Sequence, residues 1–108
     1  MGVSIAEGLL KSKFCKPADL TITRRKLSAL SGLAKKGVNV LGSNPAAVKN
    51  SDVIILAVKP FQAADVLNGI KKELTANKIL VSVVTGVMID EMEESIKKKL
   101  AYFRAMPN

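Results

Sequence analysis

The sequence predicts an α/β fold in which a mostly parallel sheet carries helices on both of its faces. Short apolar runs alternate along the whole chain with stretches whose apolar residues recur at helical spacing. The connections between them are short, which favours strand–helix–strand units with right-handed crossovers. The run at 53–58 is continuously apolar and stops at Lys59-Pro60, and such a run is typical of a parallel strand buried on both faces.

Ten elements are expected in strict alternation, beginning with a helix. The helices are expected at residues 3–12, about 26–36, 46 to about 50, 61–74 and about 89–100, and the strands at 19–23, 38–41, 52–58, 79–84 and 101–106. Gly37 suits the left-handed residue that ends the second helix. Asn44 suits the N-cap of the third helix, with Pro45 at its first helical position.

The fifth helix has its charges sorted by end. Its acidic residues come early, and Lys97, Lys98 and Lys99 come late. We therefore expect these lysines in the last helical turn, where positive charge complements the helix dipole.

Composition limits the class of protein. A chain of 108 residues with 48% hydrophobic side chains is one domain at most and can bury a core. It has no apolar run of membrane-spanning length and no secretory signal, so we expect a soluble, cytoplasmic protein without a membrane partner. The single Cys15 excludes an internal disulfide, and the absence of histidine argues against a zinc site or a cysteine–histidine nucleophile.

The net charge of +8 raises the question of a polyanionic partner. Residues 1–36 hold eight basic residues against two acidic ones, but aromatic residues, on which bases could stack, make up only 4% of the chain. General nucleic-acid binding is therefore not favoured, and a phosphate-bearing small molecule is the narrower interpretation.

Arg24-Arg25-Lys26 follows the strand expected at 19–23. In a dinucleotide-binding fold, the residue at this place meets the adenosine ribose, and an arginine there accommodates the 2′-phosphate of NADP. A guanidinium group matches phosphate in a bidentate manner. The alternative is an ordinary solvated helix start, although cations oppose the dipole at that end of a helix.

Other candidate residues lie where strands are expected to end. Lys59 follows the central strand and Thr85-Gly86 follows the strand at 79–84, and ligands of open parallel sheets bind at such carboxyl ends. Each residue also has a simpler interpretation, as a surface lysine or as ordinary loop material. Asn44 is more often a cap than a ligand contact.

One expected feature is missing. A dinucleotide-binding fold opens with a strand and a G-x-G-x-x-G turn that lets the backbone approach the pyrophosphate. Only Gly2 could belong to this turn, as its third glycine at the helix entry. We therefore expect a domain that is incomplete at its N-terminus.

Four segments resemble pyrroline-5-carboxylate reductase. Residues 50–60 end in Ala-Val-Lys-Pro and resemble a segment of that family, as do residues 81–87 with their Thr-Gly. Residues 104–108 look like the family's Arg-x-Met-Pro-Asn, and Met1-Gly2 with residues 6–9 resembles the start of its first helix. The similarity spans all 108 residues. Val-Lys-Pro at 58–60 and Arg-x-Met-Pro-Asn at 104–108, taken together at this separation, are fairly specific for the family.

The resemblance implies a Rossmann-like NAD(P)-binding domain of an enzyme that reduces 1-pyrroline-5-carboxylate to L-proline with NAD(P)H. The two arginines after the strand at 19–23 predict in addition that NADPH is preferred over NADH. Arg24, Arg25 and Asn44 would then hold the adenosine side of the cofactor. The implied cofactor-binding residues are Gly2, Arg24, Arg25, Asn44, Ala57, Val58, Lys59, Pro60, Val84, Thr85 and Gly86. Asn108 would lie near the point of hydride transfer, and no catalytic general acid can be named.

The chain departs from the family pattern in three ways. The first strand with most of the phosphate loop and the C-terminal dimerisation domain are missing, and Val84-Thr85 stands where small alanines are usual. We therefore expect residues 1–108 to be a truncated NAD(P)-binding domain with a gap in its sheet, inactive alone. The complete protein is expected to be a homo-oligomer that acts on a small-molecule substrate.

Two alternatives stay open at this point. The chain could belong to another NADP-dependent dehydrogenase of the β-hydroxyacid type, because the missing domain sets substrate specificity. It could also be a non-catalytic basic module that binds nucleotides or nucleic acid.

Overall fold

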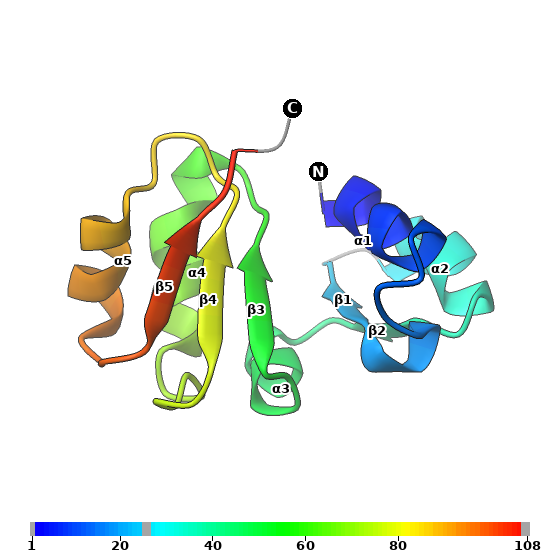
Figure 1. Cartoon of the computed structure of the whole chain (residues 1–108), viewed down its shortest axis with the longest axis horizontal. Helices are drawn as coiled ribbons and strands as arrows, with labels where there is room; N and C mark the ends of the chain where they lie inside the picture. Colours follow the sequence, from blue (N-terminus) through cyan, green and yellow to red (C-terminus); the bar gives the residue numbers. More distant parts are fainter. Residues whose placement is uncertain (1, 25–26, 107–108) are drawn as a thin grey trace. The chain divides into compact units, whose positions relative to one another are not determined.

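The computed structural model describes residues 2–24 and 27–106, and the chain divides into two compact units, Met1–Ala47 and Val48–Asn108 (Figure 1). All ten expected helices and strands occur in the expected order. The parallel α/β architecture is therefore confirmed, although the strands form two sheets, one of two strands and one of three. No described pairing joins the two sheets.

The first unit is built on a short parallel pair of strands. It contains α1 (Gly2–Lys11), β1 (Thr21–Thr23), α2 (Ser31–Lys35) and β2 (Asn39–Leu41), with 3-10 turns at Pro17–Asp19 and Leu27–Leu30. Ile22 lies opposite Val40 in the register, and both pack on the core cluster of this unit. That cluster consists of the buried residues Ala6, Leu30, Leu33 and Val38.

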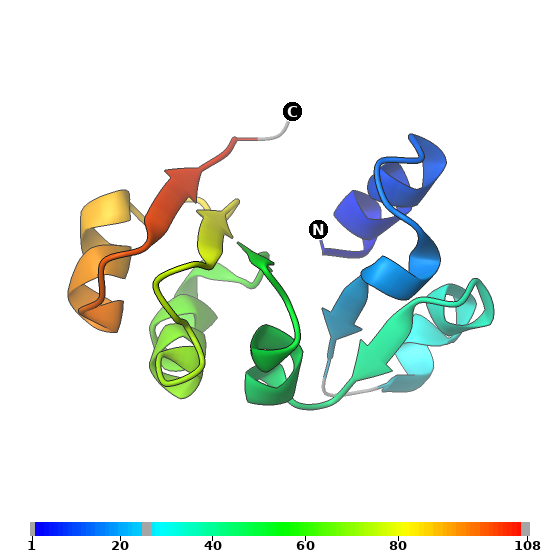
Figure 2. The same ribbon diagram turned by 60° about the horizontal axis from the view of Figure 1, so that its bottom comes forward.

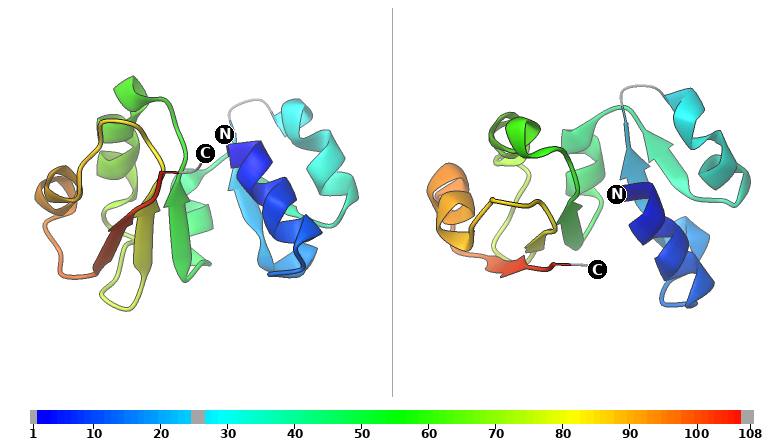
Figure 3. Two further views of the ribbon diagram at one scale, coloured as in Figure 1. Left: turned by 45° about the horizontal axis from the view of Figure 1, so that its top comes forward. Right: turned by 90° about the horizontal axis from the view of Figure 1, so that it is seen from above.

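The second unit is larger. It holds the end of α3 (Asn44–Lys49), then β3 (Val53–Leu56), a 3-10 turn at Pro60–Gln62, α4 (Ala63–Ile70), β4 (Ile79–Ser82), α5 (Ile89–Ile96) and β5 (Ala101–Arg104). The strands run parallel in the order β3-β4-β5. This order requires two crossovers in the same direction, so α4 and α5 pack on the same face of the sheet (Figures 2 and 3).

The core of the second unit lies between that face and the helices. Leu80, on the central strand, and Met92, on α5, are completely buried there. The buried cluster comprises Val48, Leu56, Ala63, Leu67, Ile70, Leu74, Leu80, Val84, Val87, Met92 and Ile96. Every strand and α-helix of the unit except β5 contributes to this cluster. The cluster includes Leu56, at the end of β3, and Val84 and Val87, in the loop after β4, so the core anchors the backbone at both strand ends.

The other face of the three-stranded sheet is not covered by helices of this unit. Val53 and Phe103 are each 53% exposed, and Ile55 is 39% exposed. The expectation that β3 is buried on both faces is therefore wrong for this chain. Side chains alternate along a strand, so a face that lacks its own helices leaves every second apolar residue open.

Two lysines of the second unit bind carbonyl groups at or just beyond the ends of helices. The Nζ of Lys78, at the start of β4, donates to the carbonyl oxygens of Val48 (2.9 Å) and Ser51 (2.5 Å), at and beyond the end of α3. The Nζ of Lys98 donates in the same way to Lys71 and to Leu74 (3.0 Å), beyond the end of α4. A cation is favourable at a helix C-terminus, where carbonyl groups lack helical partners.

The lysine arrangement corrects the expectation for the fifth helix. Helix α5 ends at Ile96, and Lys97 has a left-handed backbone with φ 58°. Lys97, Lys98 and Lys99 therefore lie outside its last turn, and Lys98 serves α4 instead. The left-handed residue stops the helix before its charge pattern ends.

Other helices also begin or end at residues that differ from those expected from the sequence. The expected helix at 26–36 is a 3-10 turn followed by the five-residue α2, and α4 stops at Ile70. Gly37 has φ 94°, which confirms its left-handed role after α2. Asn44 is not the cap of α3: Ser43 is, because its Oγ accepts the N–H of Ala46 at 3.3 Å. None of the helices described has the length and apolar character needed to cross a membrane.

Candidate functional site

The predicted site residues fall into one group in each unit. In the first unit, Arg24 directly follows the carboxyl end of β1, and its side chain is exposed. Its backbone N–H donates to the carbonyl oxygen of Leu41 at 3.3 Å, which extends the pairing of β1 with β2 by one step. The sheet therefore fixes the backbone from which the guanidinium group projects.

Asn44 lies at the start of α3 and reaches back to β1. Its Oδ1 accepts a hydrogen bond from the Oγ1 of Thr23, at 2.5 Å, and the contact is partly buried. The structure thus brings Asn44 to the residue that precedes Arg24, as expected of residues that share a ligand. Sequence reasoning missed Thr23, since its pattern of alternation indicated only a strand.

Of three further predicted site residues, the structure describes only Gly2. Gly2 is the first described residue of α1 and is half-buried, so its place at a helix start agrees with the prediction. Arg25 and Asn108, predicted for the adenosine side and the hydride-transfer point, lie outside the described residues. Their roles stay predictions.

In the second unit, the turn after β3 is held by a reciprocal pair of hydrogen bonds. The N–H of Lys59 donates to the Oε1 of Gln62 at 3.2 Å, and the N–H of Gln62 donates back to the carbonyl oxygen of Lys59 at 2.9 Å. Lys59 and Pro60 are exposed, whereas Ala57 and Val58 are half-buried. The turn therefore presents the ammonium group of Lys59 at the carboxyl end of β3.

The loop after β4 is held by a buried serine. The Oγ of Ser82 accepts the N–H of Val84 at 3.2 Å, and Ser82 is completely buried. Thr85 and Gly86 are exposed, and Gly86 has φ 83°, a backbone that suits glycine. Val84 is only 3% exposed and belongs to the core, so only its backbone could meet a cofactor.

The carboxyl end of β5 returns to the same edge. The N–H of Ala105 donates to the carbonyl oxygen of Ser82 at 2.8 Å. Because the three strands are parallel, their carboxyl ends share one edge of the sheet. The two loops and the end of β5 are therefore neighbours within the second unit.

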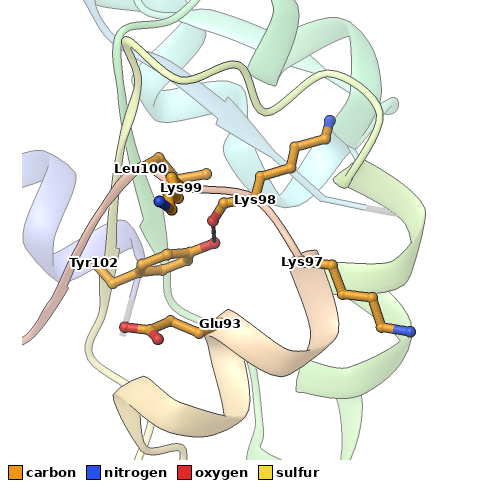
Figure 4. Close-up of a pocket in the computed structure, with 6 residues that line it drawn as sticks. All are labelled: Glu93, Lys97, Lys98, Lys99, Leu100 and Tyr102. Carbon is orange, nitrogen blue, oxygen red and sulfur yellow. Dashed lines mark hydrogen bonds between the residues drawn. The ribbon is translucent and has the colours of Figure 1, made fainter.

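A separate depression of about 330 Å³ lies at the amino end of β5 (Figure 4). It is lined by Glu93, Lys97, Lys98, Lys99, Leu100 and Tyr102. The hydroxyl of Tyr102 donates to the carbonyl oxygen of Lys98 at 2.7 Å. Burial, and secondly the nearby charge of Glu93, raise the pKa of Tyr102. This depression is remote from the carboxyl edge and contains none of the predicted site residues.

The comparisons with known proteins agree with this geometry. Pyrroline-5-carboxylate reductase 1 of Dictyostelium discoideum is 38% identical over 108 residues, which is all of this chain and 20% of that protein. The pyrroline-5-carboxylate reductase of Methanosarcina acetivorans is 32% identical over 109 residues, all of this chain and 40% of that protein. The chain thus spans less than half the length of these relatives.

Solved structures show the same relationship. A pyrroline-5-carboxylate reductase from Coxiella burnetii superposes with a TM-score of 0.91 at 31% identity, covering 99% of this chain and 40% of that one. The Plasmodium falciparum pyrroline carboxylate reductase with NADP bound superposes with a TM-score of 0.87 at 30% identity, covering 100% of this chain and 38% of that one. The resemblance expected from the sequence is therefore confirmed, and the Rossmann-like fold with it.

The family match is the most general of these findings. The family described as "NADP oxidoreductase coenzyme F420-dependent" matches residues 1–86, which include both strands of the first unit and the loops after β3 and β4. The chain belongs to this family of NADP-linked oxidoreductases.

Proposed function

We propose that this chain supplies the cofactor-binding part of a pyrroline-5-carboxylate reductase, which reduces 1-pyrroline-5-carboxylate to L-proline. The observation that carries the proposal is the similarity along the whole chain, at 31% and 30% identity, to two solved reductases, one of them with NADP bound. The class of chemistry also fits, because a dinucleotide supplies the hydride when bound and the protein supplies position.

In this proposal, the first unit binds the adenosine end. Arg24 is exposed at the carboxyl end of β1, where a guanidinium group can pair with a 2′-phosphate. Arg25 would add a second positive charge, and Asn44 offers an amide next to Thr23, the residue that precedes Arg24. NADPH is accordingly the preferred cofactor, because NADH lacks the group that these residues would bind.

The second unit would bind the nicotinamide end. The backbone of Ala57 and Val58 and the turn at Lys59-Pro60 would line the approach of the ring. The loop at Val84, Thr85 and Gly86 would flank it, with the valine contributing backbone only. Asn108 would lie beside the reacting atoms. No described residue is assigned as a general acid.

Residues 1–108 are then a truncated NAD(P)-binding domain, and the substrate pocket and the homo-oligomer interface belong to the remainder of the longer reductase. A cytoplasmic location is part of the same proposal and comes from the sequence alone. We expect no measurable proline formation by the 108-residue chain with NADPH and 1-pyrroline-5-carboxylate, so sustained turnover would contradict the truncated-domain interpretation.

Titration of the chain with NADPH and with NADH, followed by calorimetry, tests the binding itself. We expect saturable binding of NADPH that is tighter than that of NADH. A steeply salt-dependent affinity for DNA of any sequence, without a response to NADPH, would instead favour the basic binding module.

A further inference from the structure

The contact between Thr23 and Asn44 determines which way the asparagine amide faces. Both contacting atoms are oxygens, and a carbonyl oxygen can only accept, so the Thr23 hydroxyl is the donor to the Asn44 Oδ1. The Nδ2 group must then point away from Thr23. In the described part of the chain, no acceptor meets the two N–H groups of this nitrogen.

The surroundings indicate what kind of group these free donors would meet. Thr23 is the last residue of β1, and the next residue is Arg24, whose exposed guanidinium has donors only. Asn44 is half-buried at the start of α3, so its amide is held rather than free to rotate in solvent. Donors from an amide and a guanidinium at one strand end together suit an anion with several acceptor oxygens.

We propose that Thr23 is a positioning residue for cofactor choice: its hydroxyl locks Asn44 with the Nδ2 outward, as a donor to the 2′-phosphate of the adenosine ribose. The inference rests on the proposed function and deepens it, since Arg24 alone supplies charge whereas the Thr23–Asn44 pair supplies direction. Without the lock, the amide could turn its oxygen toward the phosphate, and two acceptors would face each other.

The test uses 2′,5′-ADP and 5′-AMP as probes, because they differ by the 2′-phosphate and need only the adenosine end of the site. Thr23→Val keeps the shape of the side chain but removes its hydroxyl. We expect it to weaken binding of 2′,5′-ADP by roughly tenfold, the size of one hydrogen bond to a charged group, and to change binding of 5′-AMP little. Thr23→Ser restores the hydroxyl and should return the affinity to within about twofold of the original.

Asn44→Asp tests the other half of the pair, the Nδ2 donor that Thr23 would orient. The carboxylate still accepts from Thr23 but has no N–H and carries a negative charge, so 2′,5′-ADP binding should fall more than with Thr23→Val. A merely structural tie between β1 and α3 would instead lower the affinity for both probes equally in Thr23→Val, and that result would overturn the role of Thr23.

Two further outcomes separate this inference from the proposed function. If the unsubstituted chain bound neither probe, the proposed function would fail and the role of Thr23 with it. If Arg24→Ala abolished the preference for 2′,5′-ADP while Thr23→Val and Asn44→Asp both left it intact, the proposed function would stand and the role of Thr23 would be refuted. Should Thr23→Val not fold, as judged by circular dichroism, Thr23→Ala, which also removes the hydroxyl, decides in its place with the same two probes.

Discussion

The first unit, Met1–Ala47, carries eight basic residues against two acidic ones, whereas the second, Val48–Asn108, carries nine against seven. The second unit, which has the smaller excess of positive charge, has the larger buried core. Among the described residues, four form the buried cluster of the first unit and eleven form that of the second. One unit concentrates charge, and the other concentrates apolar burial.

This difference bears on how each unit is stabilised. Burial of apolar surface is the main favourable term in folding, while an excess of like charge opposes compactness. We therefore expect the second unit to be stable by itself and the first to depend on a bound anion. Binding to the folded state alone raises stability with ligand concentration, so a phosphate-bearing cofactor would protect the first unit preferentially.

The largest expected effect comes from the core of the second unit. Leu80→Ala removes a completely buried side chain from the central strand and should lower the free energy of unfolding of that unit by about 2–5 kcal/mol. Leu33→Ala is the matched change in the first unit. Hydrogen exchange measured segment by segment reports each unit. Equal loss of protection in both units from Leu80→Ala would show that they unfold cooperatively as one body. The claim that the second unit is stable by itself would then be wrong.

The next effect concerns the lysine at the start of β4. Lys78→Met keeps the length of the side chain but removes the hydrogen bonds from Nζ to the carbonyl oxygens of Val48 and Ser51. The carbonyl oxygen of Val48 keeps the N–H of Ser51 as a donor. We expect a loss of about 1–3 kcal/mol in urea denaturation, because hydrogen bonds from a buried, charged donor are removed. The control Lys98→Met alters the same kind of contact at an exposed residue and should cost roughly 0.5 kcal/mol. Equal costs would argue that burial of Lys78 is unimportant.

The charge of the first unit gives a smaller, selective effect. Replacing Arg24 and Arg25 by alanine should weaken NADPH binding about tenfold at low salt and leave NADH nearly unchanged. Lys35→Ala, an exposed lysine on α2, is the control for loss of charge alone. Parallel titrations with the two dinucleotides measure the preference. An unchanged preference in the arginine variant would remove the assignment of these residues to the 2′-phosphate.

The smallest effect is expected at helix ends. Lys13, after α1, and Lys97, after α5, both have left-handed backbones, with φ 61° and 58°. Lys97→Gly should raise the melting temperature of the second unit by the equivalent of at most about 1 kcal/mol, because glycine adopts this conformation without strain. Lys97→Ala should bring no such gain. Lys13→Gly is the matched change in the first unit. A higher melting temperature from Lys13→Gly and none from Lys97→Gly would contradict the expectation for Lys97.

The order of elements could be predicted because its signals are local. Apolar runs such as 53–58 and punctuating residues such as Gly37 and Pro60 act within a few positions of the chain. The element ends could not be predicted as well. The end of α5 depends on one left-handed lysine, and the role of Lys98 depends on carbonyl groups more than twenty residues away.

The candidate site was predictable only in part. Strand ends could be located, which placed Arg24, Lys59 and Thr85 where the structure has them. The burial of Val84 and the contact of Thr23 with Asn44 come from packing and from a partner 21 residues away. Motif resemblance names positions that meet a ligand, but it does not say whether a side chain or only its backbone is available there.

The three-carbonyl setting of Lys78 has a consequence for chemical labelling. Acylating reagents attack the free amine of a lysine, and Lys78 is 9% exposed with its nitrogen engaged by the carbonyl groups of Val48, Lys49 and Ser51. Lys78 should therefore be acylated much later than the exposed Lys59 or Lys99. The rate of its acylation would follow the local unfolding of the second unit around it. Mass spectrometry of this one modification would therefore report how often that unit opens locally.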